Sequence, residues 1–416
     1  MSELHERDLI YDWNDTPAAE PPRRRVSVVD ETLWEAVNAP SATRPALATQ
    51  LEMLRSAAAL HMREANLGAF SPDTAEHLER LARAIDEERL PLAPALTVNA
   101  DEAAVQAADA LAQRVGRRLR LNLRVPVGEA ERLEMGLSLE TVAHQLTLAL
   151  RAAARLGFEP RVALHDASRA RPEALRRLLG VSALEGANHI CLGDRGGCAA
   201  PSGVRHLVVF TRGVLDELGS AARLGWFGRN DRDLALANAL EAHRHGVEML
   251  HGTVLGLGHG AGCVPVDLLL ANLLLLGAID ADLSALKRYC DLAAGALGVT
   301  IPVNYPIVGA DAFRTATGVH AAAIIKARRK GDHWLADRVY SSVPAGLFGL
   351  TQIIDVGPMS GESNAAAWLE HHGIEPRPEV VKHVIARAKQ STHTLTTDEI
   401  LEAVGELAGR AAGEAR

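Results

Sequence analysis

Three segments in succession decide the fold: LRLNLRV at Leu119–Val125, LETVAHQLTLALRAAARL at Leu139–Leu156, and RVAL at Arg161–Leu164. The outer two are short and rich in leucine and valine, which is typical of β-strands. The middle segment carries apolar residues at helical spacing, and Ser138 directly before it is a favourable N-cap residue. Together they predict one strand-helix-strand unit.

The same alternation recurs from Val26 to about Ile279. Further strands are expected at Val26–Val29, Ala95–Val98, His189–Leu192, Gly225–Phe227 and Val247–Leu257, with a weaker one at Gly68–Phe70. Further helices are expected at Ala46–Ala65, Pro72–Glu88, Ala103–Arg114 and Leu234–His245, with Ser71 and Asn99 as N-caps of the second and third. About eight such repeats predict the α/β class, as a (β/α)8 TIM barrel. A doubly wound sheet fits less well, because no strand is followed by an early glycine-rich phosphate-binding turn.

The length of 416 residues exceeds what one barrel needs. Because a barrel takes roughly 250 residues, we expect three parts: an N-terminal extension at residues 1–25, the barrel at 26–280 and a C-terminal accessory region at 281–416. The last part includes Ser363–Leu407, where two or three amphipathic helices are expected around a proline-marked break.

Composition argues against several functional classes. The cysteines are Cys191, Cys198, Cys263 and Cys290. They are too few and too scattered for a disulfide framework or a paired-thiolate zinc site, and we expect a cytoplasmic protein. The net charge of −8, with both signs interleaved, disfavours nucleic acid and anionic membranes as partners. The longest apolar run, Val264–Ile279, is too short and too polar to span a membrane and predicts a buried helix.

In a parallel barrel the chemistry lies at the C-terminal ends of the strands, so the residues that follow each strand are the candidates for the site. The informative segments are Asp30–Glu35, His165–Arg169, Asp194–Gly197, Trp226–Asp231 and Gly256–Cys263.

Five motifs in order then carry a resemblance. They lie at Asp30–Glu35, at Phe227–Asp231, at Gly258–Cys263, at Thr317–Lys326, and in the paired segments Asp337–Tyr340 and Gly357–Gly361. By position they match the Asp/Glu-x-Thr-Leu-Arg-Asp/Glu-Gly, His-x-His-Asn-Asp, Gly-Glu-Arg-x-Gly-Asn and Ser-Gly-x-His runs, and the C-terminal subdomain, of one family. The chain resembles the 2-isopropylmalate synthase and homocitrate synthase family, metal-dependent TIM-barrel acyltransferases related to 3-hydroxy-3-methylglutaryl-CoA lyase.

The resemblance implies a reaction in amino-acid biosynthesis. Acetyl-CoA, or another acyl-CoA, condenses with a 2-oxo acid, and the acyl group becomes an alkyl group on transfer. It also implies a divalent cofactor (Mg²⁺, Mn²⁺ or Zn²⁺) and a homodimer. In that dimer the segment with His320 and Tyr340, the expected acid/base residues, completes the partner's site.

Several motif positions depart from the family pattern. Glu35 keeps the carboxylate ligand of the metal, but the histidine pair is replaced by Phe227 and Arg229. Trp34 stands in place of the catalytic arginine, and Cys263 stands in place of the asparagine near the metal. Neither phenylalanine nor arginine binds a divalent cation, so these changes remove the metal ligands and the cation for the developing alkoxide together.

Two more positions differ from the family. Arg195 stands where the family presents a threonine, and His165 replaces the acid of a Glu-Asp-x-x-Arg segment whose arginine is kept as Arg169. Together with Arg229, these residues are the expected substrate-binding contacts.

The altered site is open to two interpretations. In one, the fixed charge of Arg229 fills the vacated metal position beside Glu35. In the other, His165, His259 and Cys263 form a relocated metal site, since imidazole and thiolate suit zinc.

Two functions therefore stand side by side. The chain is either an acyltransferase of the 2-isopropylmalate or homocitrate synthase type with a remodelled site, or a catalytically degenerate paralogue that acts as a regulatory or assembly partner.

Overall fold

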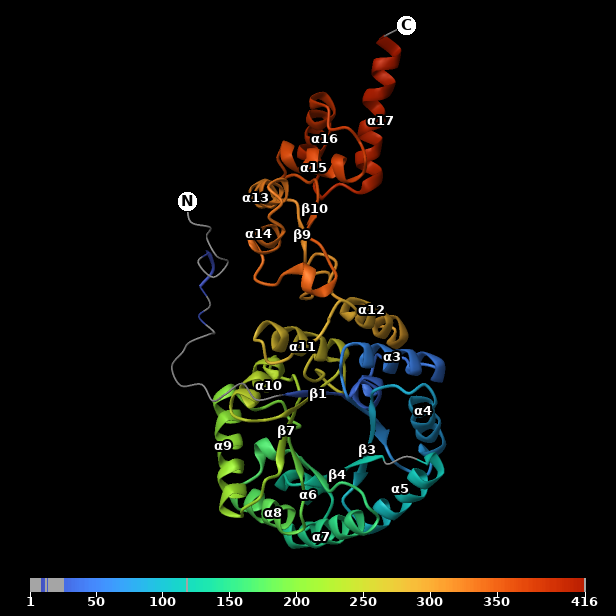
Figure 1. Ribbon diagram of the computed structural model, residues 1–416, viewed down its shortest axis with the longest axis vertical. Helices are drawn as coiled ribbons and strands as arrows, with labels where there is room; N and C mark the ends of the chain where they lie inside the picture. The colour runs from blue at the N-terminus through green and yellow to red at the C-terminus, as the bar shows by residue number, and fades with distance from the viewer. Residues whose placement is uncertain (1–8, 12, 14–25, 117–118, 415–416) are drawn as a thin grey trace. The chain divides into compact units, whose positions relative to one another are not determined.

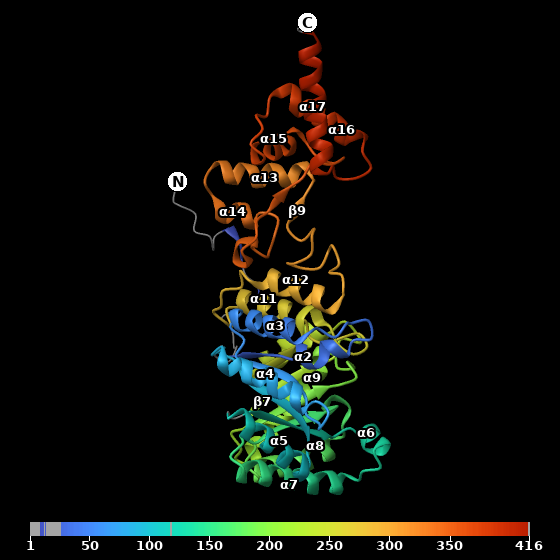
Figure 2. The same cartoon turned by 90° about the vertical axis from the view of Figure 1, so that its right-hand side faces the viewer.

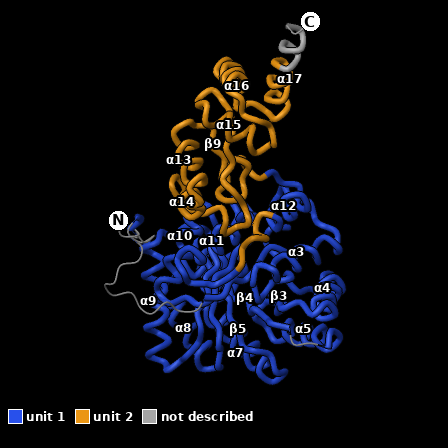
Figure 3. Tube along the Cα trace, turned by 45° about the horizontal axis from the view of Figure 1, so that its top comes forward, with its two compact units in different colours: residues 1–281, 288–300 blue, residues 282–287, 301–416 orange. Residues whose placement is uncertain are grey.

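The computed structural model describes residues 9–11, 13, 26–116 and 119–414. The chain forms two compact units, one of residues 1–281 with 288–300 and the other of residues 282–287 with 301–416 (Figure 3). Most of the expected N-terminal extension, residues 1–25, lies outside the described residues.

The first unit is a closed barrel of parallel strands in sequence order, which confirms the predicted fold class. The strands are β1 Ser27–Asp30, β2 Glu64–Ala69, β3 Ala93–Asn99, β4 Arg120–Pro126, β5 Arg161–His165, β6 His189–Asp194, β7 Arg223–Gly228 and β8 Met249–Gly252. The barrel closes where β8 pairs with β1, from Met249 opposite Ser27 to Gly252 opposite Asp30.

Helices surround the barrel (Figure 1). They are α2 Thr32–Glu35, α3 Leu47–Ala59, α4 Ala75–Glu87, α5 Glu102–Val115, α6 Glu129–Glu134, α7 Leu139–Arg155, α8 Pro172–Leu184, α9 Pro201–Glu217, α10 Ala235–Arg244, α11 Val266–Leu275 and α12 Leu286–Leu297. The short α2 and α6 follow β1 and β4 directly and lie at one end of the barrel, where the strands finish (Figure 2).

The barrel interior contains charged groups. Glu64 of β2 and Arg161 of β5 are both about 2% exposed and form an ion pair at 2.7 Å, and Arg120 of β4 also contacts Glu64. Burial would raise the pKa of Glu64, but the two guanidinium groups outweigh it, and the pKa is lowered. A buried carboxylate is tolerated only with such partners.

Most predicted elements are present, with three corrections at their ends. The helix expected at Ala46–Ala65 ends at Ala59, and the strand expected at Gly68–Phe70 begins earlier, at Glu64. The strand was not predicted to begin at Glu64 because a charged residue interrupts the apolar pattern of a strand. The arginines that make its burial possible, Arg161 and Arg120, are far away in the sequence. The strand expected at Val247–Leu257 stops at Gly252 and is followed by a 3-10 turn, because the glycine-rich sequence after it turns the backbone.

The helix caps are also partly corrected. Ser138 caps α7 as predicted, accepting a hydrogen bond from the Thr141 N–H at 3.0 Å. Asp101 rather than Asn99 caps α5, and accepts from the Ala104 N–H at 2.8 Å. The predicted helix at Pro72–Glu88 begins only at Ala75, after Thr74 rather than Ser71.

A residue of helix α12 forms a buried hydrogen bond with the last residue of β1. Tyr289 is fully buried, and its hydroxyl donates a hydrogen bond to the Asp30 carboxylate at 2.7 Å. Burial raises the pKa of Asp30, although hydrogen bonds from Thr32 and Tyr289 oppose that rise. The Thr32 hydroxyl also accepts a hydrogen bond from the Val254 N–H at 3.0 Å, so the segments that follow β1 and β8 are joined at the closing seam of the barrel.

The second unit is mainly helical. Its elements are β9 Arg314–Thr315, α13 Gly318–Arg329, α14 His333–Arg338, β10 Ile353–Ile354, α15 Glu362–His371, α16 Pro378–Gln390 and α17 Thr397–Glu414. The last three helices enclose a core that includes Trp368, Val384 and Ile400, which confirms the amphipathic helices expected there. Over the described residues, no helix is both long enough and apolar enough to cross a bilayer.

Candidate active site at the barrel mouth

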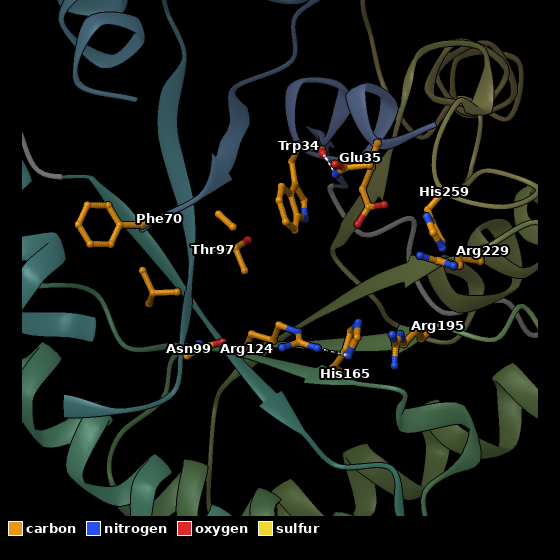
Figure 4. Close-up of a pocket in the computed structure, with 13 residues that line it drawn as sticks. Trp34, Glu35, Phe70, Thr97, Asn99, Arg124, His165, Arg195, Arg229 and His259 are labelled. Atoms are coloured by element: carbon orange, nitrogen blue, oxygen red, sulfur yellow. Dashed lines mark hydrogen bonds between the residues drawn. The ribbon is translucent and has the colours of Figure 1, made fainter. Parts of the chain in front are cut away.

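A pocket of about 510 Å³ opens among the C-terminal ends of the barrel strands (Figure 4). Its lining residues are Trp34, Glu35, Asn38, Ala69, Phe70, Thr97, Val98, Asn99, Arg124, His165, Arg195, Arg229 and His259. Because they come from strand ends and the loops behind them, the pocket lies where TIM-barrel enzymes carry their chemistry.

Positive charge dominates this pocket. Arg124 lies near the C-terminal end of β4, Arg195 follows β6 and Arg229 follows β7, and all three arginines line the pocket. His165 and His259 add two imidazoles, whereas Glu35 is the only acid among the described residues of the lining. A concave site with this charge favours an anionic ligand such as a carboxylate.

Glu35 is the last residue of α2 and points into the pocket. Figure 4 shows its carboxylate, the His259 ring and the Arg229 guanidinium turned toward one another. Burial, with a smaller contribution from Glu31, raises the pKa of Glu35 to about 7, while Arg229 and Arg195 act to lower it. The arginines therefore offset only part of the cost of ionising this group.

Glu131 of α6 holds the opposite wall. Its carboxylate, about 4% exposed, accepts hydrogen bonds from Arg124 and from His165 Nδ1, the latter at 2.9 Å, and the Arg195 guanidinium approaches to 3.9 Å. Burial acts to raise the pKa of Glu131, but His165 and the arginines reverse the effect, so the pKa is lowered. Glu131 thus orients three cationic or basic side chains toward the ligand space.

A smaller chamber of about 110 Å³ lies below the mouth, inside the barrel. It is lined by Glu31, Trp34, Glu35, Asn66, Thr97, Asn122, Arg124, Ala163, Leu164, His165, Cys191, Gly193, Phe227 and His251. Glu31 accepts hydrogen bonds at 2.7 Å from Asn66 Nδ2 on one oxygen and from His251 Nδ1 on the other. Burial acts to lower the pKa of His251, but Cys191 and Glu31 outweigh it and raise the pKa to about 10.

The structure brings only part of the expected site together. His165, Arg195, Arg229 and Glu35 line the mouth pocket, whereas Arg169 is absent from the described lining and pairs with Asp166 at 2.8 Å.

Three more expected residues lie elsewhere. Cys263 is completely buried behind the mouth, and burial raises the pKa of its thiol. His320 and Tyr340 lie in the second unit, where their rings are in contact at a tilt of 32° with centroids 4.1 Å apart, and both side chains are exposed.

The donor set does not fit a divalent metal. Of the three positions expected to hold the ion, only Glu35 presents a ligand atom, since Phe227 has none and Arg229 carries a positive charge without a free lone pair. The alternative set of His165, His259 and Cys263 is not assembled either: within the described ranges, no three His, Cys, Asp or Glu side chains are grouped to hold an ion.

Several site residues are not anticipated from the sequence. Arg124, Glu131 and His251 lie around the pocket and the chamber. Arg124 was detectable, because it alternates with the apolar residues of a strand that was correctly expected at Leu119–Val125. Glu131 was not, since its partner His165 is 34 residues away.

The chain is similar to proteins of known function. The family model described as HMGL-like matches residues 38–293. A homocitrate synthase of Pyrococcus horikoshii is 29% identical over 272 residues, covering 65% of this chain and 71% of that protein. An (R)-citramalate synthase of Aquifex aeolicus is 28% identical over 231 residues, covering 54% of this chain and 41% of that protein.

Solved structures give the same fold. Hydroxymethylglutaryl-CoA lyase from Pseudomonas aeruginosa superposes with a TM-score of 0.56 and 17% identity, covering 66% of this chain and 94% of that one. The carboxyl transferase domain of Rhizobium etli pyruvate carboxylase superposes with a TM-score of 0.53 and 13% identity, over 86% of this chain and 62% of that one. At these identities the likeness extends to the fold alone.

Proposed function

This chain belongs to the HMGL-like family, and from that premise we propose that it transfers the acyl group of an acyl-CoA, such as acetyl-CoA, to a 2-oxo acid, with arginine side chains in place of a metal ion. The family relationship expected from the sequence motifs is confirmed. The observation that carries the proposal is the convergence of Arg195 and Arg229 on the space beside Glu35. Relatives named homocitrate synthase and citramalate synthase support the reaction class.

The arginines suit both ends of a 2-oxo acid. A guanidinium binds a carboxylate through two parallel hydrogen bonds, which fixes the orientation of the substrate. A second fixed cation near the ketone oxygen stabilises the alkoxide that forms when the deprotonated methyl carbon of the acyl group attacks the ketone carbon. Arg229 and Arg195 are placed to divide these two tasks, with Arg124 as a further carboxylate contact.

Proton transfer falls to the side chains facing these arginines. Glu35 and His259 face Arg229 across the same part of the pocket (Figure 4). A carboxylate within reach of the acyl group accepts the methyl proton, and the site does not need to change its net charge in doing so. Glu35→Gln is therefore expected to abolish turnover while ligand binding persists.

A second function is favoured by Trp34 and Phe227. Both replace polar motif residues with large rings, and both line the chamber into which an acyl group would reach. A paralogue altered in this way would bind a 2-oxo acid or CoA without turnover and act as a regulatory or assembly partner.

Thiol release from acetyl-CoA with a panel of 2-oxo acids separates the two functions. The assay is run with EDTA and with added Mg²⁺, Mn²⁺ or Zn²⁺, and binding of each 2-oxo acid is measured by calorimetry. Turnover that persists in EDTA and is lost in Arg229→Met supports the proposal. The matched control is Arg176→Met on the outer face of α8, half exposed and paired with Glu217, which should behave as the parent. Binding without turnover supports the second function, and turnover only with added metal contradicts the arginine-based site.

We also propose a homodimer in which His320 and Tyr340 serve the partner's site. Their exposed rings, which are in contact with each other, support this role, because an exposed imidazole-phenol pair is available to a second surface. Light scattering tests it: a monomeric mass, or turnover unchanged in His320→Ala, would refute it.

A further inference from the structure

The chamber below the mouth contains a thiol, an imidazole and a carboxylate in series. Glu31 accepts the His251 Nδ1 hydrogen bond at 2.7 Å, and the other oxygen of Glu31 is held by Asn66. The opposite ring nitrogen of His251, Nε2, is buried and makes no hydrogen bond within the described chain. Cys191 lines the same chamber.

The surroundings of His251 indicate that this arrangement is built rather than incidental. The residue is 4% exposed, and an unpaired buried polar atom costs free energy that must be recovered elsewhere. The thiol of Cys191 and the carboxylate of Glu31 are the neighbours that favour the charged imidazolium. Glu31 holds this ring in one orientation, and Cys191 lines the same chamber. A thiol, an imidazole and a carboxylate are the residue types that serve as nucleophile, proton carrier and orienting acid in covalent catalysis.

The chamber is accessible from the mouth pocket. The two spaces share Trp34, Glu35, Thr97, Arg124 and His165 in their linings, so a ligand in the mouth can extend into the chamber. About 110 Å³ accommodates an acetyl-sized group, since a water molecule takes about 30 Å³ of liquid volume.

From this geometry we infer that Cys191, His251 and Glu31 form a nucleophilic triad that takes the acyl group from an acyl thioester onto Cys191. The inference rests on the proposed function for the identity of the donor, an acyl-CoA.

The acyl transfer balances without any further reactant. Cys191 attacks the thioester carbonyl carbon as the thiolate, paired with the His251 imidazolium that holds its proton. The bond from that carbon to the CoA sulfur breaks, and the departing thiolate takes the proton from His251, leaving CoA thiol and an acyl-cysteine. Water later cleaves the acyl-cysteine bond, which releases the carboxylic acid and restores the thiol. Glu31 positions the ring and stabilises its positive charge throughout.

Mass spectrometry of the protein incubated with acetyl-CoA alone tests this step. We expect a mass gain of one acetyl group, mapped to the peptide that carries Cys191 and absent from Cys191→Ala and Cys191→Ser. Acetylation should slow by roughly a hundredfold in His251→Gln, because glutamine can neither pair with the thiolate as a cation nor protonate the departing CoA sulfur. Cys198→Ala is the matched control, because the Cys198 thiol contacts Asp194 and Ser168 rather than an imidazole, and the acetylation pattern of this variant should equal the parent's.

The outcomes separate this inference from the proposed function. Acetylated Cys191 without condensation supports the triad and contradicts the proposed condensation. Condensation at full rate in Cys191→Ser overturns the triad and leaves the proposed function standing. Neither acetylation nor thiol release overturns both. Alkylation by iodoacetamide adds an independent reading: Cys191 should react faster than Cys198, and a rate unchanged by His251→Gln would also overturn the triad.

Discussion

Replacing Glu35 with glutamine should stabilise the protein at alkaline pH and not at acidic pH. The pKa of Glu35 is about 7 in the folded chain against an ordinary value of 4.5, chiefly because of burial. Between these values the folded chain holds the proton more tightly than the unfolded chain does. Stability linked to the protonated carboxyl is thus fully present below pH 4.5 and is lost as the pH rises through about 7.

The magnitude follows from that difference. At about 1.36 kcal/mol per pKa unit, ionising Glu35 in the fold costs about 3 kcal/mol above pH 7. Because glutamine never ionises, Glu35→Gln should raise the free energy of unfolding by up to about 3 kcal/mol at pH 8 and by less than about 1 kcal/mol at pH 5. Urea unfolding at the two pH values, with EDTA present, measures the difference.

A matched variant of opposite sign lies across the pocket. The pKa of Glu131 is lowered by His165 and the arginines, so its ionised form stabilises the fold above its ordinary pKa and Glu131→Gln should destabilise at pH 8. If Glu35→Gln also destabilises at pH 8, the positive charges around Glu35 outweigh its burial, and the reasoning is refuted. A loss of stability that appears only without EDTA would identify a bound metal ion as that charge.

Three more outcomes are expected. Phe227→His combined with Arg229→His should give the purified protein stoichiometric bound zinc by elemental analysis, since two imidazoles and a carboxylate make a three-ligand site; absence of metal would show that these substitutions are not what removed it. Glu64→Gln should lower the free energy of unfolding by about 3–5 kcal/mol, because it leaves Arg161 charged, buried and without its main partner; a loss below about 1 kcal/mol in urea would contradict this. Tyr289→Phe should cost about 1–2 kcal/mol by the same assay, through the hydrogen bond lost by a buried carboxylate, and an unchanged midpoint would indicate that water replaces the hydroxyl.

The barrel was predictable because its signal is local. The alternation of short apolar strands with helices at 3.6-residue spacing is written in contiguous stretches such as Leu119–Leu164, and the N-cap at Ser138 is decided within four residues. Strand β2 was misplaced for the opposite reason. Glu64 and Asn66 point into the barrel as polar residues, and their burial depends on Arg161 and Glu31, which no local pattern can anticipate.

The same distinction between local and distant signals applies to the site. Glu35, His165, Arg195 and Arg229 are predictable because they follow barrel strands, and the topology alone brings the strand ends together. The contacts that set their chemistry were not readable, since Glu131 reaches the mouth from a separate helix. Likewise, no local pattern indicates a role for His251. Its position in the chamber is set by a hydrogen bond to Glu31, which lies 220 residues earlier in the sequence.

The hydrogen bond between Tyr289 and Asp30 joins residues 259 positions apart, and this separation has a consequence for biosynthesis. At roughly 5–20 residues per second, a ribosome needs tens of seconds after making β1 to make α12. Until then the Asp30 carboxyl lacks its hydrogen bond from the Tyr289 hydroxyl. Strand β1 also lacks β8, the strand with which it pairs to close the barrel. The nascent barrel therefore stays open at its first strand for most of its translation, so this seam is where a chaperone would find the growing chain exposed.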